Sequence, residues 1–284
     1  MKLRRSGRLV DMTNYLLSHP HSLVPLTYFS ERYQSAKSSI SEDLTIIKQT
    51  FEQQGAGTLQ TVPGAAGGVK FVPGMDAEEA RMILGSLRQK MAAPDRLLPG
   101  GYLYLTDILG DPALVQKIGR MFASLFADRK IDLVMTVATK GIPLAYAAAN
   151  YLNVPVIIVR RDSKVTEGST VSINYVSGSS KRIQTMVLAK RSLRESSNVL
   201  IIDDFMKAGG TINGMVSLLD EFQANVAGIG VLVETEGAEE RLVDDYVSLV
   251  KLTGVDVKGK QIELQEGNLF DPGRYWRMEE KKKG

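Results

Sequence analysis

Apolar residues in the first quarter of the chain follow helical spacing first and strand spacing later. A first helix is predicted over residues 7–18 and a short second helix after Pro25. A third helix is indicated by one continuous apolar stripe, formed by Ile40, Leu44, Ile47 and Phe51. Two β-rich runs at 58–62 and 69–72 then flank a glycine-rich tip, which predicts a hairpin. Helices followed by such a hairpin are typical of a winged helix, a helix-turn-helix fold with a β-wing that binds DNA.

Polar residues mark the expected starts of the second and third helices. Thr27 is the expected N-cap of the second helix. Ser39 and Glu42 have the spacing of a capping box, in which two side chains satisfy backbone amides at the start of the third helix. The alternative for residues 1–74 is a small α+β module with no nucleic-acid role.

From about residue 100 onward, apolar runs alternate with helical patterns. Four runs are almost continuously apolar, as strands buried on both faces of a parallel sheet are: 131–137, 154–159, 199–202 and 226–233. Helical patterns lie between them, at 113–127, 143–152 and 211–223. This alternation predicts an α/β domain with a doubly wound parallel sheet.

The remaining segments complete the organisation of the chain. A helix with one polar face is expected over 76–92, and we place the domain boundary between residues 74 and 75, giving domains 1–74 and 75–284. Residues 163–184 are rich in Ser, Thr, Gly and Asn and are expected to form an extended flexible arm. Residues 279–284 are expected to be a frayed tail.

Composition narrows the function classes. No cysteine is present, so a disulfide framework and a thiolate metal site are excluded. His19 and His21 flank Pro20 in an expected loop and do not indicate a metal site. No apolar run is long enough to span a membrane, and we expect a cytoplasmic protein. Residues 1–74 hold eight Lys or Arg against five Asp or Glu, so the whole net charge of +3 lies in the predicted DNA-binding module.

The sharpest chemical motif lies at residues 199–211. Asp203 and Asp204 follow the apolar run directly, at the strand end where α/β sheets bind ligands. A loop with small residues then leads to a helix that is expected to begin near Thr211. Glycines let backbone amides approach a phosphate, and the helix N-terminus adds partial positive charge. Adjacent carboxylates suit the 2′- and 3′-hydroxyls of ribose, so the motif predicts a ribose-phosphate site. The order of acids and glycines fits neither a Rossmann loop nor a Walker loop.

At these residues the chain resembles the type I phosphoribosyltransferase family, over roughly residues 95–235. The resemblance implies that Asp203 and Asp204 hold the ribose. It implies that the loop holds a 5′-phosphate, through Lys207, Ala208, Gly209, Gly210 and Thr211. The turn of Ala138, Thr139, Lys140 and Gly141 is similar to the pyrophosphate loop of the family. The segments 99–102 and 106–108 resemble the start of adenine- and xanthine-type members.

Two departures from the enzymes predict that the chain is not a catalyst. Lys207 stands where enzymes of the adenine and xanthine type usually have a small residue, and a Ser/Gly-rich run at 169–182 replaces the catalytic arm. With its N-terminal module, the chain resembles the purine operon repressors of Gram-positive bacteria, through segments such as 38–44 and 203–214. That resemblance implies a homodimer that represses purine genes by binding operator DNA and is released by phosphoribosyl pyrophosphate. No cofactor is expected to be required, with Mg²⁺ as an optional companion of the effector.

Positive charge around the expected pocket suggests a second ligand. Lys207, Lys140 and Arg160 supply more charge than one monophosphate needs. We therefore expect a guanosine polyphosphate, such as guanosine tetraphosphate, to compete for the same site. Tyr102 or Phe205 is expected to stack on its base.

The expected DNA contacts follow from how a recognition helix enters the major groove. Its N-terminal residues and those off its apolar stripe reach base edges, here Lys37, Ser38, Ser39, Thr45 and Lys48. Arg5, Arg8 and the wing residue Lys70 are expected to reach phosphates.

Two other functions stay open at this point. One is an active purine phosphoribosyltransferase whose N-terminal module is regulatory or oligomeric. The other is an RNA-binding attenuator of the pyrimidine type. A helix followed by a wing favours duplex DNA, because a helix fits the major groove of B-DNA and not the narrow major groove of RNA.

Overall fold

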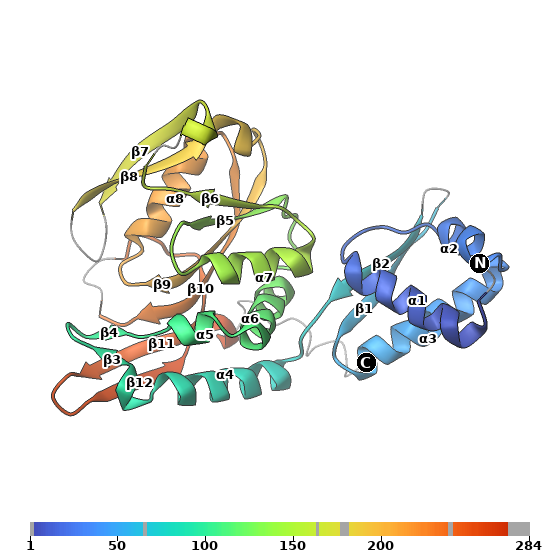
Figure 1. The fold of residues 1–284 in the computed structure, drawn as a ribbon, viewed down its shortest axis with the longest axis horizontal. Coiled ribbons are helices and arrows are strands. Elements are labelled where there is room, and N and C mark those ends of the chain that lie inside the picture. Colours follow the sequence, from blue (N-terminus) through green and yellow to red (C-terminus); the bar gives the residue numbers. More distant parts are fainter. Residues whose placement is uncertain (1–2, 65–66, 163–164, 177–181, 238–240, 272–284) are drawn as a thin grey trace. The chain divides into compact units, whose positions relative to one another are not determined.

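The computed structural model describes residues 3–64, 67–162, 165–176, 182–237 and 241–271. The chain divides into two compact units, of which the first runs to Asp76 and the second begins at Ala77 (Figure 1). Within the described residues, no helix has the length and apolar character needed to cross a membrane.

The first unit is a winged helix, as the sequence predicts. Its elements are, in order, α1 (Arg5–Ser18), α2 (Leu26–Tyr33), α3 (Lys37–Gln53), β1 (Gly57–Val62) and β2 (Gly68–Pro73). The two strands form an antiparallel hairpin in which Gln60 lies opposite Lys70. Val24, between α1 and α2, forms an antiparallel bridge with Val69, and each residue donates its amide to the carbonyl of the other at 2.9 Å. This bridge ties the wing to the chain between the first two helices.

The core of the first unit confirms the predicted apolar stripe of α3. All four stripe residues are buried, together with Met12 and Leu16 of α1 and Phe29 and Tyr33 of α2. The rings of Phe51 and Phe71 pack with centroids 4.7 Å apart, which joins the end of α3 to the wing. Burial of each such side chain stabilises the fold by roughly 1.5–3 kcal/mol.

The predicted helix caps are wrong. α2 begins one residue before Thr27, and α3 begins two residues before Ser39, so both residues lie inside the first turn. The N-caps are Pro25 and Ala36, neither of which makes a side-chain capping bond. Glu42 therefore does not close a capping box. The carboxylate of Glu42 lies 3.6 Å from a guanidinium nitrogen of Arg5 in α1 instead.

The second unit is built on a six-stranded sheet. Its strands are β5 (Leu133–Val137), β6 (Val156–Val159), β9 (Asn198–Met206), β10 (Asn225–Thr235), β11 (Val247–Asp256) and β12 (Gln261–Glu266). Their spatial order is β12-β11-β10-β9-β5-β6, and every neighbouring pair is parallel except the antiparallel edge pair of β11 and β12. The four predicted strands are confirmed as β5, β6, β9 and β10, whereas β11 and β12 were not predicted.

Helices cover both faces of this sheet, which confirms the doubly wound fold. The helices are α4 (Ala77–Met91), α5 (Thr106–Leu109), α6 (Pro112–Leu125), α7 (Ile142–Leu152) and α8 (Gly210–Glu221). Ile212 and Met215 of α8 share a core with Val231 of β10. The next strand position back, Gly230, faces α6, where an added Cβ would lie 2.8 Å from the ring of Phe122. The two layers of helices therefore pack against opposite faces of the same strands.

The predicted arm is extended in its described part, where it forms a β-hairpin, and its flexibility stays a prediction. β7 (Thr170–Val176) pairs antiparallel with β8 (Ile183–Ala189) along its whole length. The hairpin packs against α8 at Gly214, where an added Cβ would lie 2.9 Å from Cγ of Tyr175 and 3.1 Å from Sδ of Met186 (Figure 1). Residues 177–181 and the expected tail at 279–284 lie outside the described residues.

Short elements complete the second unit. They are β3 (Leu97–Leu98), β4 (Tyr102–Leu103) and 3₁₀ turns at Pro94–Arg96, Val165–Glu167, Lys190–Ser192 and Asn268–Phe270. β3 and β4 pair antiparallel in a small hairpin. Arg96 holds this hairpin, because its guanidinium binds both carboxylate oxygens of Asp107 and the carbonyl oxygen of Tyr104.

Candidate functional site

The loop between β9 and α8 has the backbone of an anion site. β9 continues past Ile202, where the predicted strand ended, through both aspartates to Met206. α8 begins at Gly210, and its N-cap Gly209 has a φ of 84°, in the left-handed region that favours glycine. The first amides of a helix have no partner within the helix and carry partial positive charge. The loop thus presents backbone donors beside the end of β9.

Asp203 and Asp204 form a carboxylate pair that is largely removed from water. Asp203 is 4% exposed and Asp204 is half-buried. The amide of Asp204 donates to Oδ1 of Asp203 at 3.0 Å. Burial raises the pKa of Asp203 well above its usual value, and the charge of Asp204 raises it further. Burial also raises the pKa of Asp204, against a lowering by its bond to Asp203 and by the charge of Lys140. Such a pair gains most from donors or cations that a ligand brings.

The turn after β5 lies against this carboxylate pair. Gly141 is buried, and a Cβ added there would lie 2.7 Å from Oγ1 of Thr136 and 3.1 Å from Oδ1 of Asp203. The hydroxyl of Thr136 is buried and has no hydrogen-bond partner among the described residues. Thr139 and Lys140 are exposed on the same turn. The sequence therefore identified two segments, 62 residues apart, that the fold places side by side.

The other expected effector residues are placed less tightly. Lys207 is exposed, and Phe205, Ala208 and Thr211 are half-buried around the loop. Tyr102 is 67% exposed on β4. Nε of Arg160 lies 3.5 Å from a carboxylate oxygen of Glu167. Among the described contacts, none joins Tyr102 or Arg160 to the carboxylate pair, so their roles stay predictions.

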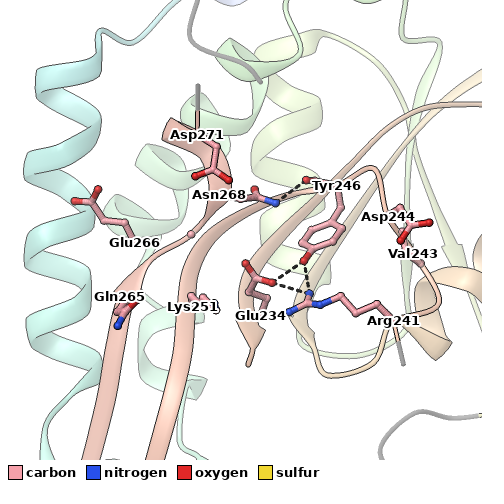
Figure 2. Close-up of a pocket in the computed structure, with 11 residues that line it drawn as sticks. Glu234, Arg241, Val243, Asp244, Tyr246, Lys251, Gln265, Glu266, Asn268 and Asp271 are labelled. Carbon is pink, nitrogen blue, oxygen red and sulfur yellow. Dashed lines mark hydrogen bonds and ion pairs between the residues drawn. The ribbon is translucent and has the colours of Figure 1, made fainter. Parts of the chain in front are cut away.

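A buried polar network lies behind the loop and was missed by sequence reasoning. Glu234, near the end of β10, accepts hydrogen bonds from the hydroxyls of Tyr246 and Ser248, both at 2.6 Å. Arg241 makes an ion pair with Glu234 at 2.6 Å and donates to the Tyr246 hydroxyl (Figure 2). Burial and the Glu234 carboxylate raise the pKa of Tyr246 above its usual value. A pocket of about 520 Å³ is lined by Glu234, Arg241 and Tyr246 of this network and also by Lys251.

The expected base-reading residues lie on the exposed side of α3. Lys37 and Ser38 are exposed, and Ser39 is half-buried in the first turn. Thr45 is exposed, and its hydroxyl donates to the carbonyl oxygen of Ser41 at 2.9 Å, within the helix. Lys48 is exposed and lies 3.9 Å from Glu52, one turn further on. These positions are free to approach a base edge, and the contacts themselves stay predictions.

Two of the expected phosphate ligands lie beside a buried carboxylate of the winged helix. Nε of Arg5 donates to Asp43 at 3.0 Å, and Nε of Arg8 donates to the other oxygen of the same carboxylate. Arg8 also donates to the hydroxyl of Ser35, and only 11% of its side chain is exposed. Asp43 is fully buried, and a buried carboxylate needs such partners. The guanidinium of Arg8 is therefore already engaged within the winged helix, which favours a structural role, and its expected phosphate contact stays a prediction. Arg5 keeps an exposed side, and Lys70 of the wing is half-buried.

Known families match both units. Residues 4–73 match the family described as bacterial purine repressor, N-terminal. Residues 105–266 match the phosphoribosyl transferase domain. Among solved structures, the adenine phosphoribosyltransferase from Thermoanaerobacter pseudethanolicus has a TM-score of 0.52 and 25% identity, and the match covers 59% of this chain and 99% of that one.

Full-length relatives carry the same two parts in one chain. The purine biosynthesis transcriptional repressor PurR of Bacillus subtilis is 74% identical over 270 residues, which cover 95% of each chain. The purine biosynthesis transcriptional activator PurR of Lactococcus lactis subsp. lactis is 49% identical over 269 residues, which cover 95% of this chain and 99% of the relative. Identity of this extent over nearly the whole of both chains settles the family. The chain belongs to the PurR family of purine biosynthesis transcriptional regulators, with a purine repressor N-terminal domain followed by a phosphoribosyltransferase-type domain.

Proposed function

We propose that the protein represses purine biosynthesis genes by binding duplex operator DNA through its winged helix. The identity of 74% to a protein named as a repressor, against 49% to one named as an activator, supports repression over activation. The exposed start of α3, with Lys37 and Ser38 clear of the core, supports insertion of that helix into the major groove. Paired half-sites on DNA are read by dimers, and we include a homodimer held by the second unit in the proposal.

Phosphoribosyl pyrophosphate is the proposed effector, and its binding releases the operator. The observation that carries this is the buried Asp203 beside Gly141, next to the Thr136 hydroxyl, which has no hydrogen-bond partner in the described part of the chain. The ribose hydroxyls would donate to the aspartates, and the 5′-phosphate would take the amides of the 207–211 loop. The pyrophosphate would lie on the 139–141 turn.

The carboxylate pair also fits a Mg²⁺ ion that arrives with the effector. Mg²⁺ prefers oxygen ligands and is commonly held by one or two carboxylates plus the phosphates of its ligand. Within the described residues, no group of three or more His, Cys, Asp or Glu side chains forms a site by itself. The ion would thus depend on the effector for the rest of its ligands.

Guanosine tetraphosphate is the proposed competitor at the same site, and the protein is proposed to be a sensor and not a transferase. Lys207 and Lys140 are both exposed beside the two ligand-binding segments, where they can meet additional phosphates. In this loop, Lys207 stands where the enzymes usually have a small residue, and this difference supports a loss of catalysis.

Two measurements on the full-length chain test this proposal. Fluorescence anisotropy with purine-operator duplex should show tight binding that phosphoribosyl pyrophosphate reverses and guanosine tetraphosphate preserves. A pyrophosphate-release assay with each purine base should show no turnover. Turnover with any purine base would establish the active transferase instead, and an operator affinity that ignores phosphoribosyl pyrophosphate would remove it as the effector. A chain lacking residues 1–74 should still sediment as a dimer, and a monomer would move the dimer contact to the winged helix.

A further inference from the structure

The segment formed by Leu242 and Val243 lies against the proposed phosphate loop. The amide of Leu242 donates to the carbonyl oxygen of Ala208 at 3.0 Å. A Cβ added at Gly209 would lie 3.2 Å from Cγ2 of Val243, so this side chain already fills the space behind the loop. Leu242 and Val243 together therefore contact two consecutive residues of the loop, Ala208 and Gly209.

This two-residue segment is itself fixed by Arg241. The guanidinium makes its ion pair with Glu234 at 2.6 Å and donates to the Tyr246 hydroxyl (Figure 2). It also donates, at 3.0 Å, to the carbonyl oxygen of Thr235. Arg241 directly precedes Leu242, so its three contacts set where the segment begins. No other described cation forms an ion pair with the buried carboxylate of Glu234.

The same network reaches the loop by a second route. Glu234 lies opposite Met206 in the parallel pairing of β10 with β9, and Met206 is the last residue before the loop. The carboxylate of Glu234 thus binds Arg241, whose neighbours contact the loop at Ala208 and Gly209. The backbone of Glu234 pairs with Met206, where the loop begins. The planar guanidinium of arginine can donate to several acceptors at once. The ammonium of a lysine would keep the positive charge and lose some of these hydrogen bonds.

We propose that Arg241 is a positioning residue for the effector site, which acts through Leu242 and Val243 on the backbone of residues 207–209. Effector affinity then depends on a side chain that lines a different pocket. The inference extends the proposed function and rests on it for one of its two measurements, the affinity for the effector. The backbone readout described below does not depend on any ligand.

The test compares full-length variants by calorimetric titration with phosphoribosyl pyrophosphate and by hydrogen exchange of the peptide that spans residues 206–214. Arg241→Ala should weaken effector binding about tenfold and speed exchange in this peptide. Arg241→Lys should recover part of both losses. Lys251→Ala is the matched control, because Lys251 lines the same pocket and pairs with Glu236 at 2.6 Å but has no contact with the loop in the described structure. It should leave both measurements unchanged.

Val243→Ala guards against a folding defect caused by the buried charge. This variant leaves the Glu234 ion pair intact and should weaken effector binding about threefold, with faster exchange in the same peptide. Unchanged affinity and unchanged exchange in Arg241→Ala would overturn the inference. If the parent protein does not bind phosphoribosyl pyrophosphate, the proposed effector is wrong, and the exchange data alone still decide whether Arg241 positions the loop.

Discussion

Two buried aspartates, one in each unit, have opposite surroundings. Asp43 of the winged helix is fully buried and receives hydrogen bonds from two arginines of α1. Asp203 of the second unit is 4% exposed, and among the described residues it has no ion pair and a second aspartate as its neighbour. Both carboxylates are buried, and among the described residues only Asp43 is paired with cations.

This difference distinguishes a carboxylate that stabilises the fold from one that binds a ligand. A buried charge with its cations in place holds a fold together, and removing one partner exposes the full cost of burying the other. A buried carboxylate with a raised pKa and no cation destabilises the free protein and is stabilised when a ligand supplies donors. We therefore read Asp43 as part of the architecture and Asp203 as part of the site, although both are acids at the edge of an apolar run.

The largest expected effect is loss of the effector response when both site acids are removed. Asp203→Ala with Asp204→Ala should weaken binding of phosphoribosyl pyrophosphate by at least about 100-fold, because charge-assisted hydrogen bonds contribute roughly 1.5–3 kcal/mol each. Operator binding without the effector should stand, and anisotropy measures both. Glu221→Ala, an exposed carboxylate at the far end of α8, is the control. A folded double variant that no longer binds operator would show that these acids support the structure instead.

The next effect is on stability, and it should appear at Asp43. Asp43→Ala should lower the free energy of unfolding of the winged helix by about 3 kcal/mol, because Arg8 stays largely buried without its partner. Urea unfolding followed by circular dichroism measures the loss. Asp203→Ala should not lower stability in the same experiment. Equal losses for the two variants would end the distinction between them.

The expected phosphate contacts divide into the same two classes, one residue for binding and one for structure. Lys70→Ala should weaken binding to all duplexes alike and lower the salt slope by about one unit, because one phosphate contact is lost. Arg8→Ala should leave the salt slope of the remaining folded protein unchanged, because its guanidinium is held by Asp43 and Ser35. Operator titrations at several salt concentrations give both slopes. A reduced slope in Arg8→Ala would return that residue to the phosphate contacts.

The smallest expected effect is on pH dependence. Because the pKa of Asp203 is raised in the folded state, the folded protein holds this proton more tightly than the unfolded chain does. The resulting stability is present at low pH and is lost as the pH rises from the usual aspartate range through the raised value. Thermal melts without effector should show this fall, and Asp203→Asn should flatten it. An identical pH profile in Asp203→Asn would mean that another group causes it.

Sequence reasoning found the elements whose patterns are local and missed those that depend on distant partners. The α3 stripe and the order of strand, loop and helix around residues 199–211 were both predicted correctly, since periodicity and residue order carry them. β11 was missed because Lys251 and Thr253 interrupt its apolar run, and β12 because an edge strand is largely polar. The capping box failed because the helix begins at Lys37, ahead of the matching residues.

The individual residues that sequence reasoning missed share the same cause. Asp43 lies among polar residues on an amphipathic helix, and nothing in its own segment shows that two arginines 35 and 38 residues away will cover it. Arg241 lies in a polar stretch more than 30 residues after the loop it supports, so only the pairing of β9 with β10 brings them together. Thr136 has the pattern of an ordinary strand residue, and only the structure shows that its buried hydroxyl lacks a partner within the described ranges.

The close packing at Gly214 has a consequence for genetics. α8 begins at the proposed phosphate loop, and one turn later it has room for only a hydrogen atom beneath Tyr175 and Met186. Any larger residue at position 214 must push the hairpin or the helix away. This position is four residues from the start of α8 and far in sequence from the winged helix. A selection for alleles that stay repressed when purines are scarce should therefore recover Gly214 substitutions repeatedly. Their carriers would need added purines to grow, and the defect would be dominant wherever mixed dimers still occupy the operator.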